Sequence, residues 1–458
     1  MHIGRRPGHL PEGADVEGIS CAQAWEDVVL HAQDAGVDLV VLTGDVVDRE
    51  NRYFEAFGPL EAGIRTLAQG GIRVVAVAGN HDFDVLPKLG QSFNPDEFRL
   101  VGAGGAWERL TIHKEGKPAL HLDGWSFPTE HYEADPLAGY RLGPAPGPAT
   151  DAPILGLLHA DLDQLRSPYA PVTAAALRGL PPRFWLLGHI HAPALYEEPG
   201  RASILYPGSP LAMSPKEPGI HGPWIIEVSD TGRVEAWQVP LSRVRYEAIV
   251  IDVEGAQTVD EVDRRFTENI LAHLQDAVAK GGEALTHLVC RVRLVGRTPM
   301  HRRIETRLEE RARQLQLSYG RAIAVVDRIS VETRPERNLG EIAYGSGPPA
   351  VLARLLLMLG GDPSDPEQER LLRKAREILR EVQGAAHYRE LKTGGVVGAP
   401  GDEGIRRVGG LAEDEVVTGE GTREDAGEDE REAKILALLE RQGLLLLDEL
   451  LAQKEEAS

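Results

Sequence analysis

The sequence is poor in cysteine and in long hydrophobic runs. Its 458 residues include two cysteines, Cys21 and Cys290, so a framework of disulfide bonds is excluded. No apolar run reaches the ~20 residues that a membrane-spanning helix needs, and the N-terminus does not read as a signal peptide. These absences predict a reduced, cytoplasmic protein without a membrane segment.

Negative charge dominates the composition, but it is unevenly distributed. The formal net charge is −21, and residues 401–458 alone contain 17 acidic and 7 basic side chains. Residues 291–313 have the opposite sign, with eight arginines and three glutamates. Because local charge decides which ligand binds where, the global figure does not exclude nucleic acid as a ligand.

The chain is too long for one compact core, so several domains are expected. From about residue 15 to 240, short apolar strand-like runs alternate with helical patterns and then give way to strand-rich sequence. This order predicts an α/β domain in which two sheets pack together and helices flank them. The predicted helices are 22–35 and 54–68, and the predicted strands are 37–42, 73–78, 153–158, 184–187, 202–206, 224–229 and 233–238.

The rest of the chain divides into smaller segments. A βαβαβ domain is predicted at 243–335, from a strand at 246–253, a helix at 259–280, a strand at 288–295, a helix at 302–317 and a strand at 322–333. The first domain (1–240) and this second one are followed by a helical region expected at 340–392, with helices at 349–359 and 366–382. A disordered acidic linker is expected at 393–431. The chain then ends in a helical segment at 432–458, which we expect to be interrupted at Gly443.

Four short polar segments each follow an apolar run: Gly44-Asp45, Gly79-Asn80-His81-Asp82, Leu158-His159 and Gly188-His189-Ile190-His191. Strand ends are where an α/β protein presents ligands, and this set combines a carboxylate, an amide and several imidazoles. The combination is typical of a two-metal hydrolase site.

Hydrolysis of a phosphate ester at neutral pH needs a hydroxide nucleophile and stabilisation of the developing charge, and two divalent ions supply both. Asp45 is the candidate to bridge such a pair. His189 and His191 lie two residues apart in extended chain, so both rings face one side. Asn80 and His159 add an oxygen and a nitrogen ligand, and His81 is placed to protonate the leaving alkoxide. Mixed nitrogen and oxygen ligands suit Mn²⁺ or Fe²⁺, with Zn²⁺ as a further candidate.

Each segment alone has a simpler interpretation. A Gly-Asp pair is usually a turn, Gly-Asn-His-Asp resembles an Asx-type turn, and a single histidine is more often structural than a ligand. The conjunction of four segments, each behind an apolar run, favours the metal site. Asp48 and Asp82 are expected to orient ligands or form turns rather than bind metal.

The order and spacing of these segments resemble the calcineurin-like metallophosphoesterases, whose pattern is D-x-H, G-D-x-x-D, G-N-H-D/E, a lone His and G-H-x-H. Within that family the chain resembles the SbcD-type DNA repair exonucleases. The narrower resemblance rests on Gly4-Arg5-Arg6, on Tyr206-Pro207-Gly208-Ser209-Pro210 and on Val292-Arg293-Leu294-Val295-Gly296-Arg297-Thr298-Pro299. It implies a two-sheet metallophosphoesterase sandwich in which 1–240 is the nuclease domain and 243–335 a capping or DNA-binding domain.

The resemblance also implies residue roles. Asp45 would bridge two divalent ions, Mn²⁺ first, with Mg²⁺, Fe²⁺ or Zn²⁺ as alternatives. Asn80, His159 and His189 would hold one ion, and His191 the other together with the D-x-H pair. His81 would stabilise and protonate at the scissile phosphate.

The first motif departs from the family pattern. His2 aligns with the histidine of D-x-H, so Met1 stands at the middle position and the aspartate would precede it. The family's first strand also has no counterpart. A GTG valine codon read as Met would explain this opening, and we therefore expect a misassigned start. If the chain does begin at Met1, one ion loses a carboxylate ligand.

The expected function is a two-metal DNA exo/endonuclease that works in DNA repair with an SbcC-type coiled-coil ATPase, as a possible homodimer. Arg297, Arg302 and Arg303 are candidates for contact with DNA phosphates, although a solvated helix face explains them equally well. Helices within 349–391 or 433–453 are candidates for docking the ATPase, or they pack on their own domain. Two alternatives stay open: a phosphoesterase for small nucleotides or phosphoproteins, and a catalytically impaired chain.

Overall fold

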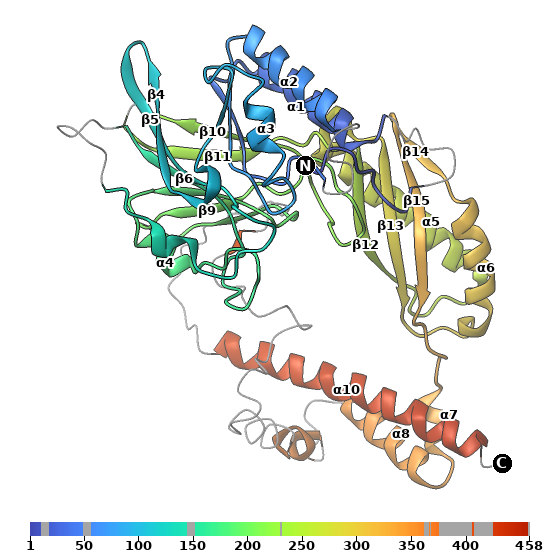
Figure 1. Ribbon diagram of the computed structural model, residues 1–458. Helices are drawn as coiled ribbons and strands as arrows, with labels where there is room; N and C mark the ends of the chain where they lie inside the picture. Colours follow the sequence, from blue (N-terminus) through green and yellow to red (C-terminus); the bar gives the residue numbers. More distant parts are fainter. Residues whose placement is uncertain are drawn as a thin grey trace. The chain divides into compact units, whose positions relative to one another are not determined.

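The computed structural model describes residues 1–10, 18–48, 56–143, 152–229, 231–360, 366, 368–374, 405–406 and 425–456 (Figure 1). The chain forms two compact units. The first comprises Met1–Gly296, Met300–Thr333 and Gly401–Leu411, and the second comprises Arg297–Pro299, Arg334–Pro400 and Ala412–Ser458. The domains predicted at 1–240 and 243–335 thus lie almost wholly within the first unit.

A three-stranded parallel sheet lies near the N-terminus, in the order β1-β2-β3. Its strands are Leu39–Leu42, Arg73–Ala76 and Phe98–Leu100. Helices α1 (Cys21–Asp34) and α2 (Phe57–Gln69) lie side by side and pack on one face through Trp25, Leu60 and Ile64. Because side chains alternate along a strand, Val74 and Ala76 face these helices while Val75 and Val77 face away from them.

A seven-stranded mixed sheet packs against that second face, in the order β16-β8-β9-β7-β6-β5-β4. Strands β5, β6, β7 and β9 run parallel to their neighbours in turn, so their carboxyl ends meet at one edge. The bounds are β4 Glu108–Lys114, β5 Lys117–Trp125, β6 Ile154–His159, β7 Phe184–Gly188, β8 Ala194–Tyr196, β9 Ser203–Tyr206 and β16 Ile405–Arg406.

Two apolar layers hold this arrangement together. Leu122, Leu155 and Leu186 fill the space between the sheets, and Leu158, Trp185 and Leu187 lie on the outer face with α4 (Ala174–Arg178). A hairpin of β10 (Trp224–Val228) and β11 (Val234–Gln238) adds side chains to the inner layer. The α/β fold class, two packed sheets with flanking helices, is confirmed. Smaller elements are α3 Leu86–Gly90 and 3₁₀ turns at Ala103–Gly105, Pro136–Gly139 and Gly282–Ala284.

The small sheet predicted after residue 243 has the order β12-β13-β15-β14. Its parallel strands alternate with two helices as expected, and the short antiparallel strand β14 is an addition. The elements are β12 Val244–Asp252, α5 Val259–Gly281, β13 His287–Val295, α6 His301–Gln314, β14 Leu317–Tyr319 and β15 Ala322–Val331. The helices cover one face, while Tyr246, Val289 and Val325 of the other face pack against Cys21 and Leu211. This second core explains why the small sheet belongs to the first unit.

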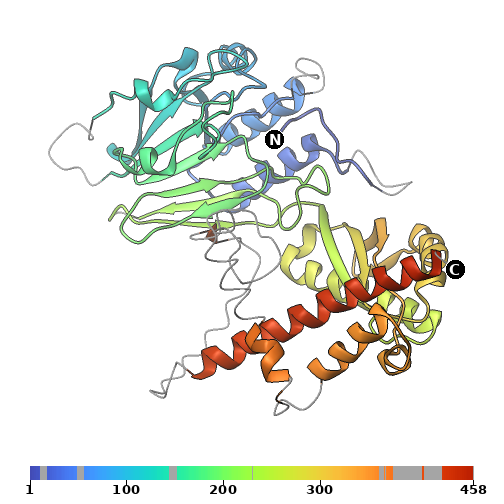
Figure 2. The ribbon, with the colours of Figure 1, turned by 90° about the horizontal axis from the view of Figure 1, so that it is seen from below.

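The second unit is helical. It contains α7 (Leu339–Ala343), α8 (Pro348–Leu359), a helical stretch at 368–374 and α10 (Asp425–Glu456). Helices α8 and α10 lie side by side (Figure 2), with Leu356, Leu359 and Leu447 between them. In the part of the chain that the structure describes, no helix is long and apolar enough to cross a membrane.

Three expectations for these segments were wrong. The helix predicted to 317 ends at Gln314, because the next residues form β14 and pair across the turn at Gly320. Residues 405–406 form a strand and α10 starts at Asp425, so these parts of the linker predicted at 393–431 are not disordered. The other residues of that linker lie outside the described residues, as do residues 375–382 of the predicted helix. Helix α10 also continues through Gly443, where a Cβ would lie 2.6 Å from Leu356 Cδ2. The glycine allows close helix packing there instead of ending the helix.

A cavity of about 2110 Å³ lies beside β1 in the first unit. Its lining includes Leu39–Leu42, the strands β10 and β11, and, at one end, Met1, His2 and Asp45. Among the described residues β1 pairs only with β2, so its second edge is open to this cavity. The N–H groups of His2 and Ile3 donate to the carbonyls of Asp45 and Val46, so this short segment runs parallel to 45–47, the residues that follow β1.

An extended apolar segment of about six residues joined ahead of Met1 should therefore pair with β1 and raise the midpoint of thermal unfolding. We expect a rise of about 5 °C or more, since about three side chains would be buried at ~1.5–3 kcal/mol each, and 1 kcal/mol moves the midpoint by roughly 1–2 °C in a unit of this size. Differential scanning calorimetry measures it. The control is a glycine-serine segment of equal length, and an equal midpoint for the two extended chains would contradict the prediction.

Candidate metal centre

The four polar segments converge at the carboxyl ends of their strands. Gly44-Asp45 follows β1, Gly79–Asp82 follows β2, His159 ends β6, and His189 follows β7. The two sheets present these ends to each other, so ligands far apart in sequence become neighbours. This is the edge at which α/β proteins usually bind ligands.

Glycine makes the convergence possible at three positions. A Cβ on Gly44 would lie 2.6 Å from His159 Nδ1, one on Gly79 would lie 2.2 Å from Asp45 Oδ1, and one on Gly188 would lie 1.8 Å from the carbonyl oxygen of Thr43. No other residue type fits such approaches. The backbone is also unusual, because Asp45 has φ 50° and His189 φ 94°, values that L-residues with side chains rarely adopt.

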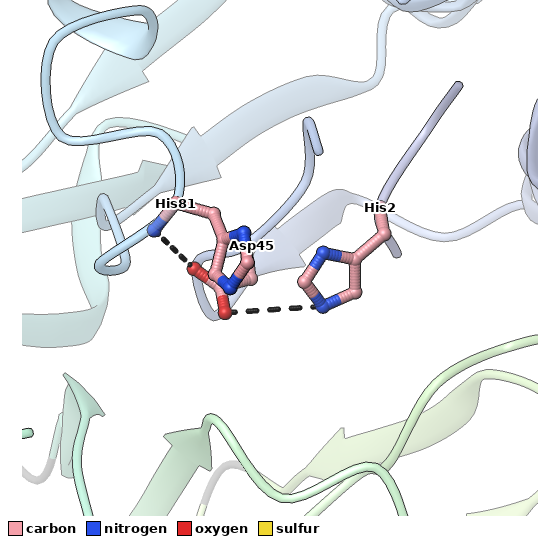
Figure 3. Close-up of side chains that lie close together, drawn as sticks. All are labelled: His2, Asp45 and His81. Carbon is pink, nitrogen blue, oxygen red and sulfur yellow. Dashed lines mark hydrogen bonds and ion pairs between the residues drawn. The ribbon is translucent and has the colours of Figure 1, made fainter. Parts of the chain in front are cut away.

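Asp45 lies at the centre of the site. Its Oδ1 accepts a hydrogen bond of 2.9 Å from the backbone N–H of His81, and its Oδ2 lies 3.3 Å from His159 Nε2 and 3.9 Å from His2 Nε2. Figure 3 shows His2 and His81 grouped at this carboxylate. Two sets of possible metal ligands, His2–Asp45–His81 and Asp45–His159–His189, share Asp45, and within each set the ligand atoms lie within 4.8 Å of one another.

His159 is oriented for ligation. It is fully buried, and its Nδ1 lies 2.9 Å from the carbonyl oxygen of Thr43. Because a carbonyl only accepts, Nδ1 carries the proton, and the lone pair of Nε2 faces Asn80 Oδ1 at 3.1 Å and Asp45. Burial opposes a charge on the His159 ring, but the Asp45 carboxylate and the Thr43 carbonyl outweigh it and raise the His159 pKa.

His2 and His191 face each other with their Nε2 atoms 3.0 Å apart. The Nδ1 of His191 lies 2.9 Å from Glu217 Oε1, which leaves a lone pair on its Nε2. Burial lowers the pKa of His2 to about 4, although Asp48 and Asp45 act in the other direction, so this ring is neutral at physiological pH. Two imidazole nitrogens that converge beside a carboxylate match the donors that a transition-metal ion binds.

His189 completes the second set. Its Nε2 lies 3.4 Å from Asp161 Oδ1, and its ring meets the ring of His159 at 5.3 Å between centroids. The Nδ1 of His189 is buried and has no hydrogen-bond partner among the described residues, an orphaned nitrogen that a metal ion would satisfy. The donor types and this orphaned atom both fit divalent metal ions.

Asp82 and Asp48 lie where residues that position the ligands are expected. Asp82 is completely buried and accepts hydrogen bonds of 2.7 Å from the N–H groups of Gly79 and Val46, so it ties together the loops after β1 and β2. Burial and the nearby Asp45 charge raise its pKa to about 6, while those two N–H groups act against the rise. Asp48 Oδ1 lies 3.3 Å from His2 Nδ1, 3.6 Å from Arg5 Nε and 3.7 Å from His81 Nδ1.

Two further acids at the site were missed in the sequence. Asp161 contacts His189, and Glu217 contacts His191 and accepts a hydrogen bond from the N–H of Met213. The His159-Ala160-Asp161 spacing was a signal for the first. Glu217 lies in a loop rich in proline and glycine and carries no local signal. Hydrogen bonds to these histidines lower the pKa of both carboxyls, although burial opposes the shift.

The arginines proposed for DNA contact are far from these ligands in sequence, and their surroundings differ from one another. Arg297, in the second unit, is 13% exposed and forms an ion pair of 2.7 Å with Asp448, which Arg334 and Arg337 also contact. Arg303 is exposed on α6, and the side chain of Arg302 lies outside the described residues. Arg297 is therefore committed to a partner from α10 that the sequence did not reveal.

Comparison with known proteins agrees with this geometry. Residues 9–193 match the family of calcineurin-like phosphoesterases, and residues 246–334 match the middle domain of the metallophosphoesterase YhaO. Over residues 9–193 the chain is thus similar to the calcineurin-like phosphoesterases. The first match covers the strand ends that carry Asp45, Asn80, His159 and His189, and with the donor set it identifies this part of the chain as a metal-dependent hydrolase domain.

Relatives extend the similarity. An uncharacterized metallophosphoesterase YhaO of Bacillus subtilis is 29% identical over 241 residues, which is 50% of this chain and 56% of that protein. The DNA double-strand break repair protein Mre11 of Methanopyrus kandleri is 22% identical over 267 residues, or 53% and 56%. The chain thus spans about half the length of these relatives. A dimetal phosphatase from Danio rerio is a remote structural likeness, with 15% sequence identity and a TM-score of 0.27 over 40% of this chain and 76% of that one.

We expect Glu217→Ala to weaken metal binding about 10- to 100-fold, because the carboxylate that orients a histidine ligand typically contributes that much affinity. Isothermal titration with Mn²⁺ measures the change, and circular dichroism confirms the fold. Glu227→Ala removes an exposed glutamate of β10 and serves as the matched control. Equal affinities for the two variants would show that Glu217 does not support His191 as a ligand.

Asp45→Asn should affect both ions, because one carboxylate serves both ligand sets. We expect metal content, measured by inductively coupled plasma mass spectrometry after gel filtration, to fall from two ions per chain to less than one. His191→Ala is the comparison, since it belongs to one side of the site and should remove one ion only. A loss of one ion in both variants would contradict a bridging Asp45.

Proposed function

We propose that this chain is a two-metal phosphodiesterase that cleaves DNA. The observation that carries the proposal is the shared Asp45, which joins two ligand sets at the facing ends of two sheets, each with one buried and one half-buried histidine. His2, Asp45 and His191 would hold one ion, and Asp45, Asn80, His159 and His189 the other. When bound, a pair of divalent ions supplies a hydroxide nucleophile and stabilises negative charge on the phosphate. Mn²⁺ is our choice of metal, on the mixed nitrogen and oxygen donors.

His81 is the residue that we assign to the proton. Its backbone N–H is held by Asp45, and its ring, about 30% exposed, faces the open side of the site with Nδ1 near Asp48. Burial lowers the pKa of His81, although the Asp45 and Asp48 charges oppose the shift. The position of this ring beside both ligand sets suits transfer of a proton to the leaving alkoxide oxygen.

DNA as the substrate is an inference from the relatives. The archaeal relative is a DNA double-strand break repair protein, and its similarity covers 53% of this chain. We further propose a coiled-coil ATPase as the partner and the α8–α10 pair as its docking site. In its support, Val351 and Leu357 of α8 and Leu446 of α10 are each between 46% and 49% exposed. A homodimer is part of the same proposal.

A phosphoesterase for small nucleotides or phosphoproteins is the second candidate. It is favoured by Arg297, which is paired with Asp448 and only 13% exposed, so one of the cations proposed for DNA is engaged elsewhere. The metallophosphoesterase name of the Bacillus relative favours it as well. On this alternative the 243–335 region would be dispensable for hydrolysis. A catalytically impaired chain is the third candidate.

Cleavage of end-labelled linear DNA tests the proposal. We expect Mn²⁺-dependent cleavage by this chain, and stronger cleavage by a chain extended upstream so that it carries the D-x-H aspartate. His81→Ala should lower kcat by roughly 10²–10⁴-fold, because a proton donor is lost. His113→Ala, at a surface position on β4, is the control variant.

Hydrolysis of bis(4-nitrophenyl) phosphate by the same samples separates the candidates. Intact hydrolysis of this diester without DNA cleavage would refute the DNA proposal and favour a small substrate. No hydrolysis of either substrate by either chain, with metal bound, would favour the impaired chain.

A further inference from the structure

We propose that Tyr169 and His131 form a stacking platform for a nucleobase next to the metal centre. The inference rests on the proposed phosphodiesterase function and deepens it, since it names the substrate class as one that carries a base beside the scissile phosphate. The platform lies on the His189 side of the site, away from His2 and His191.

Three rings in successive contact lead outward from His189, a proposed metal ligand. The Tyr169 ring lies 4.8 Å from the His189 ring between centroids, with an interplanar angle of 39°. The His131 ring lies 5.7 Å from Tyr169 with an angle of 25°, a stacked arrangement. His189 is in turn 5.3 Å from His159. A base that stacks on Tyr169 or His131 would therefore lie one or two ring spacings from His189, a proposed metal ligand.

The outer members of the stack are accessible. His131 is exposed and Tyr169 half-buried, whereas His159 at the inner end is completely buried. The loop 161–169 also presents Leu165, whose relative exposure is 72%. Tyr169 packs in part against the core on the outer face of the large sheet, while His131 is exposed and leaves the outer end of the ring pair open to a ligand. Every nucleobase has a π-face, so such a surface binds bases with little sequence preference.

The backbone fixes the platform relative to the metal ligands. The N–H of Ala170 donates to the carbonyl of Tyr132, and the N–H of Tyr132 donates to the carbonyl of Pro168. The N–H of Asp161 donates to the carbonyl of Tyr169, and the Asp161 side chain contacts His189. The segment that carries Tyr169 is therefore tied both to the segment that carries His131 and to the residue that orients His189. A rigid platform loses little entropy when a base stacks on it.

Cleavage of two diesters with and without bases tests the platform. The substrates are thymidylyl-(3′→5′)-thymidine and the diester of two abasic 1,2-dideoxyribose units. Cleavage of each by the Mn²⁺-loaded protein is followed by chromatography. We expect kcat/KM to be higher for the base-bearing diester. Tyr169→Leu should lower that value by roughly five- to a hundredfold, the range that a stacked base contributes, and leave the abasic diester unchanged. Tyr169→Phe keeps the ring and should retain the activity, and Tyr344→Leu, at a 93% exposed tyrosine of the second unit, is the control.

Two results would overturn the platform. One is an equal loss on both diesters in Tyr169→Leu, which would mean that the ring only positions His189. The other is a wild-type protein that makes no distinction between the diesters. If neither diester is cleaved, the proposed function fails, and titration calorimetry decides the platform separately. Tighter binding of thymidine 5′-monophosphate than of 2-deoxyribose 5-phosphate, abolished in Tyr169→Leu, would support it, and equal binding would refute it.

Discussion

The contact on which the site depends is the one between the Asp45 carboxylate and the imidazoles that surround it. Asp45 projects from the end of a strand in one sheet, while His159 projects from the end of a strand in the other. The carboxylate is buried, and the charge of His159 and its neighbours overcomes the cost of that burial and lowers the Asp45 pKa. Apolar packing thus sets the position of the two sheets relative to each other, and this position brings the Asp45 carboxylate next to His159.

The site requires close approach of backbone segments and unusual backbone conformations, and these lower the stability of the fold. Gly44, Gly79 and Gly188 leave no space for a side chain, and Asp45 and His189 adopt left-handed backbone conformations. Such conformations cost about 1–3 kcal/mol each and persist only where the surroundings impose them. Here the surroundings are the large apolar layers on both sides of the strand ends. Stability of the sandwich therefore holds the ligands in place before any ion binds.

Local patterns were sufficient for the parts of the fold that depend on neighbouring residues. The apolar runs before Asp45 and before Asn80 are strands, and α5 (Val259–Gly281) matches the helix predicted at 259–280. Local patterns failed where a distant contact overrode them. Glycine commonly ends a helix, yet α10 continues through Gly443, because Leu356 of α8 fills the space that the missing side chain leaves.

The sequence by itself determined the donor types and the strand ends that carry them, because each motif is a few residues long and its periodicity is local. Only the tertiary structure decided which donors meet. Glu217 reaches His191 from 26 residues away, through a loop whose path no periodic pattern records. Arg297 meets Asp448 across 151 residues and is thereby committed within the second unit. Pairings of this kind follow from the packing of whole elements, so the side chains involved carry no signal of their own in the sequence.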